Sequence, residues 1–151
     1  MEVKEILKVK GPRVWSVKSS QTVYEALDIL VKQKIGALLV YDEQGLVAGI
    51  VSERDIMREC YHNKEKFLET SVGKIMTTRL IIGAPSDSVD YIMGIMTQNR
   101  VRHIPIITQG RLEGIVSIGD VVKAQLKDSE YDKRYLKEYM FGEHSSEAAK
   151  E

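Results

Sequence analysis

The sequence is poor in cysteine and carries no net charge. With Cys60 as its one cysteine among 151 residues, the chain can form no internal disulfide, which excludes a disulfide-stapled secreted scaffold. The 22 basic residues equal the 22 acidic ones, which disfavours binding nucleic acid through a broad basic surface but leaves room for a local basic pocket.

Long apolar runs are also missing. No stretch approaches the roughly 20 apolar residues that span a bilayer. The first ten residues alternate charged and apolar side chains, which is unlike a signal peptide. We therefore expect no membrane association, and a protein of the reducing cytoplasm.

The most informative feature present is an internal repeat. Residues 49–52 read Gly-Ile-Val-Ser and residues 114–117 read the same, an offset of 114 − 49 = 65. Asp55 and Asp120 each lie three residues after the serine. Because there are only two copies, a pseudo-symmetric pair is favoured over a solenoid.

Both copies show the same order of predicted elements, β-α-β-β-α. A short strand is expected at 14–17 and at 80–82. An amphipathic helix follows, with its apolar stripe at Val23, Ala26, Leu27, Leu30 and Val31 in the first copy and at Val89, Ile92, Met93 and Met96 in the second. Thr22 and Ser88 are the expected caps. Paired strands follow at 36–41 and 46–51, and at 103–107 and 111–116, before helices that start near Ser52 and Ser117.

The remaining segments are simpler. A single helical turn is expected at 72–76, and a C-terminal helix with a tyrosine-bearing face at 128–141. The small, polar stretch 142–151 is expected to be disordered.

These motifs resemble a tandem cystathionine-β-synthase (CBS) domain pair. Each copy ends in Gly-hydrophobic-hydrophobic-Ser-x-x-Asp, Met76-Thr77 precedes the second copy, and residues 102–105 read Arg-His-Ile-Pro. The resemblance implies CBS repeats at 1–62 and 72–127, joined by a linker at 63–71. The implied fold is α/β (α+β), with the two repeats packed through their sheets and a C-terminal helix added.

The resemblance also implies a function. CBS pairs are regulatory modules that sense AMP, ADP, ATP, NAD or S-adenosylmethionine in clefts between the repeats, and two modules often form a homodimer. We therefore expect a non-enzymatic sensor with no required cofactor and an unidentified protein target. The absence of a Gly-x-Gly-x-x-Gly motif means that NAD would not bind in the Rossmann manner, and His62, His103 and His144 show no metal-ligand spacing.

The Ser-x-x-Asp motifs permit two interpretations. A serine followed three residues later by an acid is also a helix capping box. Asp is shorter than Glu and would reach back to the cap less easily, and the motif recurs in both copies, so a binding role is favoured. By resemblance, Asp55 and Asp120 bind ribose while Ser52 and Ser117 lie near phosphate.

Arg102 and His103 are the expected phosphate ligands, because both side chains donate hydrogen bonds to anions; the alternative is a solvated strand end. Ile104 and Pro105 complete that strand start. The first copy has Gly36-Ala37 instead, and Arg54 could compensate there.

For the adenine end, the resemblance points to the first strand of each repeat. It pairs Ser16 with Asp120, and Ile81, Ile82 and Gly83 with Asp55. The Asp120 cleft is therefore expected to be the better formed. Three other hypotheses stay open: a partner-binding module with vestigial clefts, a small nucleotide hydrolase, and a nucleic-acid-binding protein.

Overall fold

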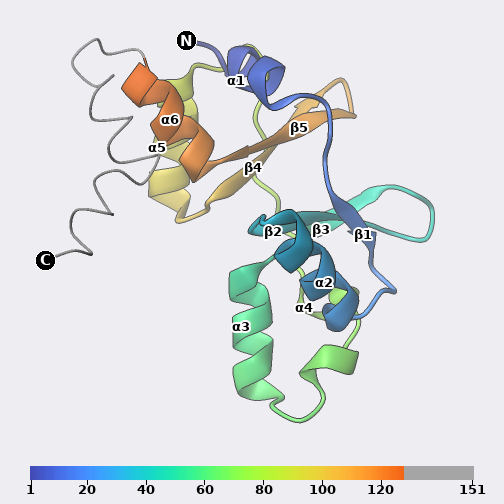
Figure 1. Ribbon diagram of the computed structural model, residues 1–151. Helices are drawn as coiled ribbons and strands as arrows, with labels where there is room; N and C mark the ends of the chain where they lie inside the picture. The colour runs from blue at the N-terminus through green and yellow to red at the C-terminus, as the bar shows by residue number, and fades with distance from the viewer. Residues whose placement is uncertain (128–151) are drawn as a thin grey trace, which may run out of the picture. The chain divides into compact units, whose positions relative to one another are not determined.

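The computed structural model describes residues 1–127, and the predicted helix at 128–141 and the tail at 142–151 lie outside that range. The described chain forms two compact units (Figure 1). Among the described residues, the Asp55 unit consists of residues 13–81, and the Asp120 unit of residues 1–12 and 82–127. The first twelve residues therefore pack with the second sequence repeat rather than with the first.

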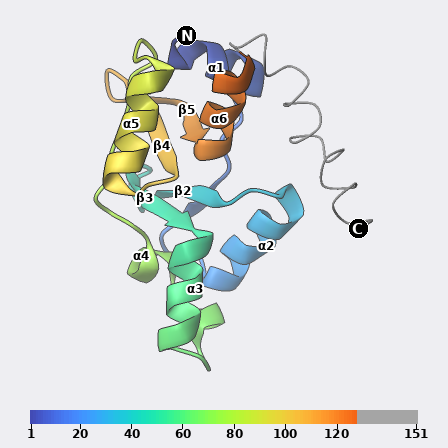
Figure 2. The same cartoon turned by 90° about the vertical axis from the view of Figure 1, so that its left-hand side faces the viewer.

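The Asp55 unit contains a three-stranded sheet covered by helices. Its elements are β1 (Ser16–Lys18), α2 (Val23–Gln33), β2 (Ala37–Tyr41), β3 (Val47–Ser52), α3 (Glu53–His62), a short 3-10 helix (Phe67–Glu69) and α4 (Val72–Ile75). β1 runs parallel to β2, and β2 runs antiparallel to β3. Figures 1 and 2 both show α2 and α3 on the same side of the sheet.

Helix α2 starts after the predicted cap Thr22 and buries part of the predicted apolar stripe. The Thr22 side chain accepts a hydrogen bond from the Glu25 backbone, and Lys34 ends the helix in the left-handed conformation. Ser88 and Arg100 do the same at the two ends of α5. Val31 was wrongly placed in the apolar stripe: it is 72% exposed, because the helix buries a narrower face than the spacing suggested.

The Asp120 unit contains a two-stranded antiparallel hairpin and three helices. These are α1 (Val3–Lys10), α5 (Val89–Asn99), β4 (His103–Thr108), β5 (Arg111–Ser117) and α6 (Ile118–Lys127). Helix α1 was not predicted. It lies against β5 and α6, as Figures 1 and 2 show, and it buries Val3 and Ile6 in the core of this unit.

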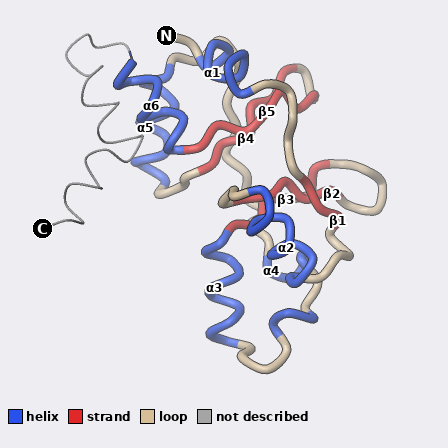
Figure 3. Tube along the Cα trace, in the orientation of Figure 1, coloured by secondary structure: helices blue, strands red, loops and turns tan. Residues whose placement is uncertain are grey.

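The strand predicted at 80–82 is not formed, and the chain between α4 and α5 runs as a loop (Figure 3). A single parallel bridge joins Gly83 to Ile106 instead. Pro85 follows two residues later and has no N–H to extend a strand ladder. A Cβ at Gly83 would lie 2.7 Å from Ile92 Cδ1, so glycine permits this close approach.

The opening segment of each repeat packs in the unit formed by the rest of the other repeat. Ile6 in α1 and Val72 in α4 are 72 − 6 = 66 residues apart, near the repeat offset, and both are buried. A Cβ at Gly114 would lie 2.8 Å from Leu7 Cδ2, and one at Gly49 would lie 2.5 Å from the Thr77 carbonyl oxygen. The absence of a side chain at Gly114 thus lets α1 approach closely, and its absence at Gly49 does the same for the segment that follows α4.

Candidate functional site

The Asp120 carboxylate lies in the first turn of α6. Its Oδ2 accepts a hydrogen bond of 2.8 Å from the Ser117 backbone N–H, and the Ser117 hydroxyl accepts one of 3.1 Å from the Asp120 N–H. These reciprocal bonds form a capping box, which satisfies backbone donors that the start of a helix leaves unpaired.

Lys10 reaches the same carboxylate oxygen from α1. Its Nζ donates to Asp120 Oδ2 at 2.8 Å and to the Ile115 carbonyl oxygen at 2.7 Å. The Asp120 side chain is 22% exposed. Within residues 1–127, Asp120 Oδ1 accepts no hydrogen bond. One oxygen of this carboxylate is therefore left without a partner by residues 1–127.

Asp55 occupies the matching place in α3, but both oxygens of its carboxylate accept hydrogen bonds. It is 7% exposed. Its Oδ2 accepts hydrogen bonds from the Ser52 N–H at 2.9 Å and the Ser52 hydroxyl at 3.2 Å, and its Oδ1 accepts one from the Thr77 hydroxyl at 3.2 Å. The Arg58 guanidinium lies 3.6 Å from Oδ1. Both carboxylate oxygens are thus engaged by the unit itself.

The capping interpretation of Ser-x-x-Asp is correct for both copies. Asp was expected to reach back to the cap less easily than Glu, yet the carboxylate accepts from the backbone N–H of the cap at 2.9 Å for Asp55 and 2.8 Å for Asp120. The two copies differ in the third partner of the carboxylate, which is Thr77 for Asp55 and Lys10 for Asp120.

The structure brings Arg102 and His103 next to the Ser117 motif. The Arg102 carbonyl accepts a hydrogen bond of 2.9 Å from the Ile118 N–H, and His103 pairs with Ser117 across β4 and β5. Arg102 is exposed and His103 is half-buried. Gly36 and Ala37 take these places in the Asp55 unit, where the Gly36 carbonyl accepts from the Glu53 N–H. Only the Asp120 end therefore carries a basic pair on its strand.

Ile104 and Pro105 are both buried. Ile104 is fully buried in the core of the Asp120 unit. The Pro105 carbonyl accepts a hydrogen bond of 2.9 Å from the Gly83 N–H. The Ile104 side chain therefore serves the packing of this unit.

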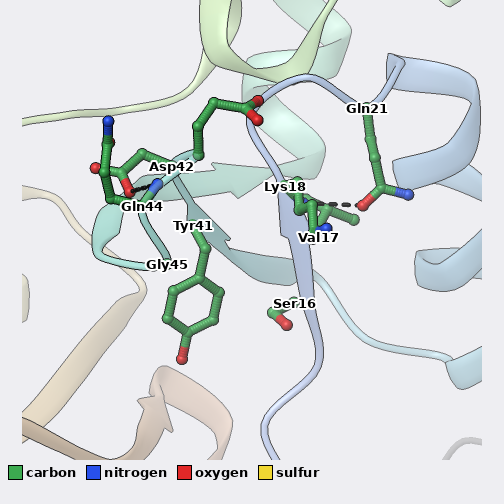
Figure 4. A pocket seen from close by; sticks show the side chains of 9 residues that line it. Ser16, Val17, Lys18, Gln21, Tyr41, Asp42, Gln44 and Gly45 are labelled. Carbon is green, nitrogen blue, oxygen red and sulfur yellow. Dashed lines mark hydrogen bonds between the residues drawn. The ribbon is translucent and has the colours of Figure 1, made fainter.

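Ser16 lines a hollow of about 570 Å³ in the Asp55 unit, shown in Figure 4. Tyr41 and the β2–β3 turn form its other wall. Asp42 Oδ1 accepts backbone hydrogen bonds from Gln44 and Leu46, both of 2.9 Å, across this turn. One rim of the hollow is therefore polar and internally hydrogen-bonded.

The carboxylate of Glu25 lies next to Gln21, which precedes it by four residues in the sequence. Gln21, which lines the same hollow, donates to Glu25 at 2.6 Å. This hydrogen bond stabilises the carboxylate and lowers the pKa of Glu25 below its ordinary value.

The other predicted positions are dispersed. Arg54 is exposed on α3, Ile81 is half-buried and Ile82 is exposed. The predicted pairing of Ser16 with Asp120 joins residues of different units and stays a prediction, as does that of Ile81, Ile82 and Gly83 with Asp55. No cluster of three or more His, Cys, Asp or Glu within residues 1–127 is arranged to hold a metal ion.

Sequence reasoning missed Lys10 and Thr77 as partners of the two acids. The spacing of Val3, Ile6 and Leu7 is that of a helix face, and it is the signal by which α1 could have been found. The contact of its last residue with Asp120 leaves no trace in local sequence.

The sequence repeat and the Ser-x-x-Asp capping boxes of α3 and α6 agree with a direct family match. The CBS domain model matches residues 3–62 and again residues 72–127. The chain belongs to the CBS domain family. A mitochondrial CBS domain-containing protein of Arabidopsis thaliana, CBSX3, is 36% identical over 149 residues, covering 93% of this chain and 72% of the relative.

Solved CBS structures have the same fold. A CBS-domain containing protein from Agrobacterium tumefaciens shares 40% sequence identity at a TM-score of 0.80, with 82% of this chain and 92% of that chain covered. CBSX2, solved in complex with AMP, shares 27% identity at a TM-score of 0.69, with 83% and 96% covered. The described residues are thus a CBS pair, and none of their helices is long and apolar enough to cross a membrane.

Proposed function

We propose that this CBS pair is a regulatory, non-enzymatic sensor that binds an adenosine nucleotide through Asp120. AMP is the first candidate, because CBSX2 was solved with AMP; ADP, ATP, NAD and S-adenosylmethionine are the others. The exposed Cys60 suits a reducing compartment such as the cytoplasm.

The available oxygen of Asp120 carries this proposal. A carboxylate accepts hydrogen bonds only, and the two ribose hydroxyls are donors at adjacent carbons. Asp120 presents Oδ1 with no partner within residues 1–127 and is partly exposed. Asp55 is buried, with both oxygens engaged. Asp120 is therefore the ribose ligand, and Asp55 is a structural acid in this proposal.

The surrounding residues supply the rest of the site. Arg102, His103 and Ser117 lie at the same end of β4 and β5 and would donate to phosphate oxygens. Ser16, Ile81, Ile82 and Gly83 would line the adenine end, and Arg54 would add a further donor. Ile104 would contribute backbone groups only, because its side chain is buried in the core, and Pro105 would complete that start of β4.

The test is calorimetric titration of the chain with each of the five ligands, followed by Asp120→Asn and Asp55→Asn. We expect AMP to bind, Asp120→Asn to weaken AMP about tenfold or more, and Asp55→Asn to change it less than about threefold. Binding of none of the five ligands, or a loss confined to Asp55→Asn, would contradict the proposal. Intact ATP after incubation with the protein is expected of a non-enzyme.

The alternative is a partner-binding module without a physiological nucleotide, which the fully engaged carboxylate of Asp55 favours for that half. Exposed apolar pairs also lie one turn apart on two helices, Met57 and Tyr61 on α3 and Ile118 and Val122 on α6. We propose that they form a homodimer interface. Light scattering should report twice the chain mass, and Met57→Glu should reduce it to one.

A further inference from the structure

Lys10 in α1 is the nearest cation to the candidate ribose ligand. Its ammonium group lies 2.8 Å from Asp120 Oδ2, and the Lys10 side chain is 38% exposed. An ammonium carries three N–H donors. Two are used, by Asp120 and by the Ile115 carbonyl, and within residues 1–127 the third has no acceptor.

The positive charge of Lys10 offsets the repulsion that the Asp120 carboxylate would otherwise exert on a phosphate. A ribonucleotide carries its hydroxyls and its phosphate on the same sugar, so a carboxylate that accepts the hydroxyls also repels the phosphate. The repulsion falls only as the inverse of distance. A cation in direct contact with the carboxylate cancels most of it, and Lys10 is placed to do so.

Asp55 shows what the matching acid looks like without that partner. Its closest partner from outside α3 and its cap is the neutral Thr77 hydroxyl, and Arg58 stands farther away at 3.6 Å with a side chain 65% exposed. The partner that comes from the opening segment of the other repeat is thus the uncharged Thr77 for Asp55 and the charged Lys10 for Asp120.

We propose that Lys10 is the specificity-determining residue that makes the Asp120 site accept nucleotide anions rather than uncharged nucleosides. Its ammonium offsets the Asp120 charge, and its third N–H donates to an oxygen of the bound nucleotide. This inference rests on the proposed binding of a nucleotide at Asp120.

The experiment compares AMP with adenosine, which differ by the phosphate alone, in calorimetric titrations of the full chain. Lys10→Met removes the charge, Lys10→Gln keeps hydrogen-bonding capacity without charge, and Lys10→Arg keeps the charge. Lys8→Met is the matched control, because Lys8 is an exposed lysine of the same helix. Thermal unfolding without ligand shows that each variant is folded.

We expect Lys10→Met and Lys10→Gln to weaken AMP about tenfold or more and adenosine less than about threefold. Lys10→Arg should keep the preference for AMP, and Lys8→Met should change neither ligand. Equal losses for AMP and adenosine would overturn the inference, since Lys10 would then act only by positioning Asp120; unchanged AMP binding would overturn it too. A wild-type chain that binds neither AMP nor adenosine would overturn this inference, and one that also binds none of the other four ligands would refute the proposed function itself.

Discussion

Lys10 and Asp120 form a hydrogen-bonded ion pair of 2.8 Å although 110 residues separate them in sequence. The pair joins α1 to the first turn of α6. Thr77 makes the corresponding contact with Asp55 in the other unit. The aspartate of each Ser-x-x-Asp motif is therefore hydrogen-bonded by a residue from the opening segment of the other repeat. Through Lys10, the start of the chain contacts the candidate site.

The Lys10–Asp120 pair should contribute modestly to stability. Both side chains are partly exposed, so solvent screens their attraction and we expect a coupling free energy of about 1 kcal/mol. The measurement is a double-mutant cycle of Lys10→Met and Asp120→Asn in urea unfolding. Strictly additive effects of the two substitutions would show that the pair contributes nothing.

Thr77→Val should destabilise the Asp55 unit by about 1 kcal/mol, because it removes a hydrogen bond to a buried carboxylate. Thr78→Val is the matched control. Thr78 is the exposed neighbour of the same type, and its substitution should change the free energy of unfolding by less than about 0.5 kcal/mol. Equal effects in urea unfolding would argue against the Thr77–Asp55 contact.

The two repeated glycines should differ in their tolerance of alanine. A Cβ at Gly49 would meet the Thr77 carbonyl, which is backbone, whereas one at Gly114 would meet the end of the Leu7 side chain. Gly49→Ala should therefore cost about 2 kcal/mol or more and Gly114→Ala less.

Gly94→Ala is the control for that pair. No atom lies within 4 Å of a Cβ built there, and Gly94 is inside α5. Alanine should stabilise the helix by about 0.5–1 kcal/mol. Thermal unfolding of the three variants should give the order Gly94→Ala, Gly114→Ala, Gly49→Ala from most to least stable; the reverse order would refute the two close approaches.

Glu25 should titrate below its ordinary range. The Gln21 hydrogen bond lowers the pKa of Glu25, so its contribution to stability is present above the unfolded-state pKa and is lost as pH falls through the lower folded-state value. Gln21→Ala should raise the pKa of Glu25. Carboxyl NMR titration of the two proteins measures this, and identical titration curves would contradict it.

Much of the fold follows from the sequence, because it is written in local patterns. The repeated Gly-Ile-Val-Ser marks the end of β3 and of β5, and the caps Thr22 and Ser88 start α2 and α5 as predicted. The prediction of a strand at 80–82 was wrong, because a short apolar run does not specify the strand with which it would pair. Helix α1 was missed because its charged residues obscured the helical spacing.

The candidate site could be predicted only in part, because some of its contacts join residues that are far apart in sequence. Ser117 and Asp120 form one local motif, and residues 102–103 lie beside it through the β4–β5 hairpin. Lys10 reaches Asp120 only through the packing of α1 on β5 and α6. Asp55 likewise accepts a hydrogen bond from Thr77, 22 residues away.

The most direct test of a ribose hydroxyl at Asp120 compares AMP with 2′,3′-dideoxy-AMP by calorimetry, in the wild-type chain and in Asp120→Asn. In the wild type we predict that loss of the hydroxyls weakens binding about tenfold or more, because a charged acceptor loses its donors. In Asp120→Asn the difference between the two ligands should shrink to about threefold or less. An undiminished difference in Asp120→Asn would show that another group binds the ribose and would contradict the account.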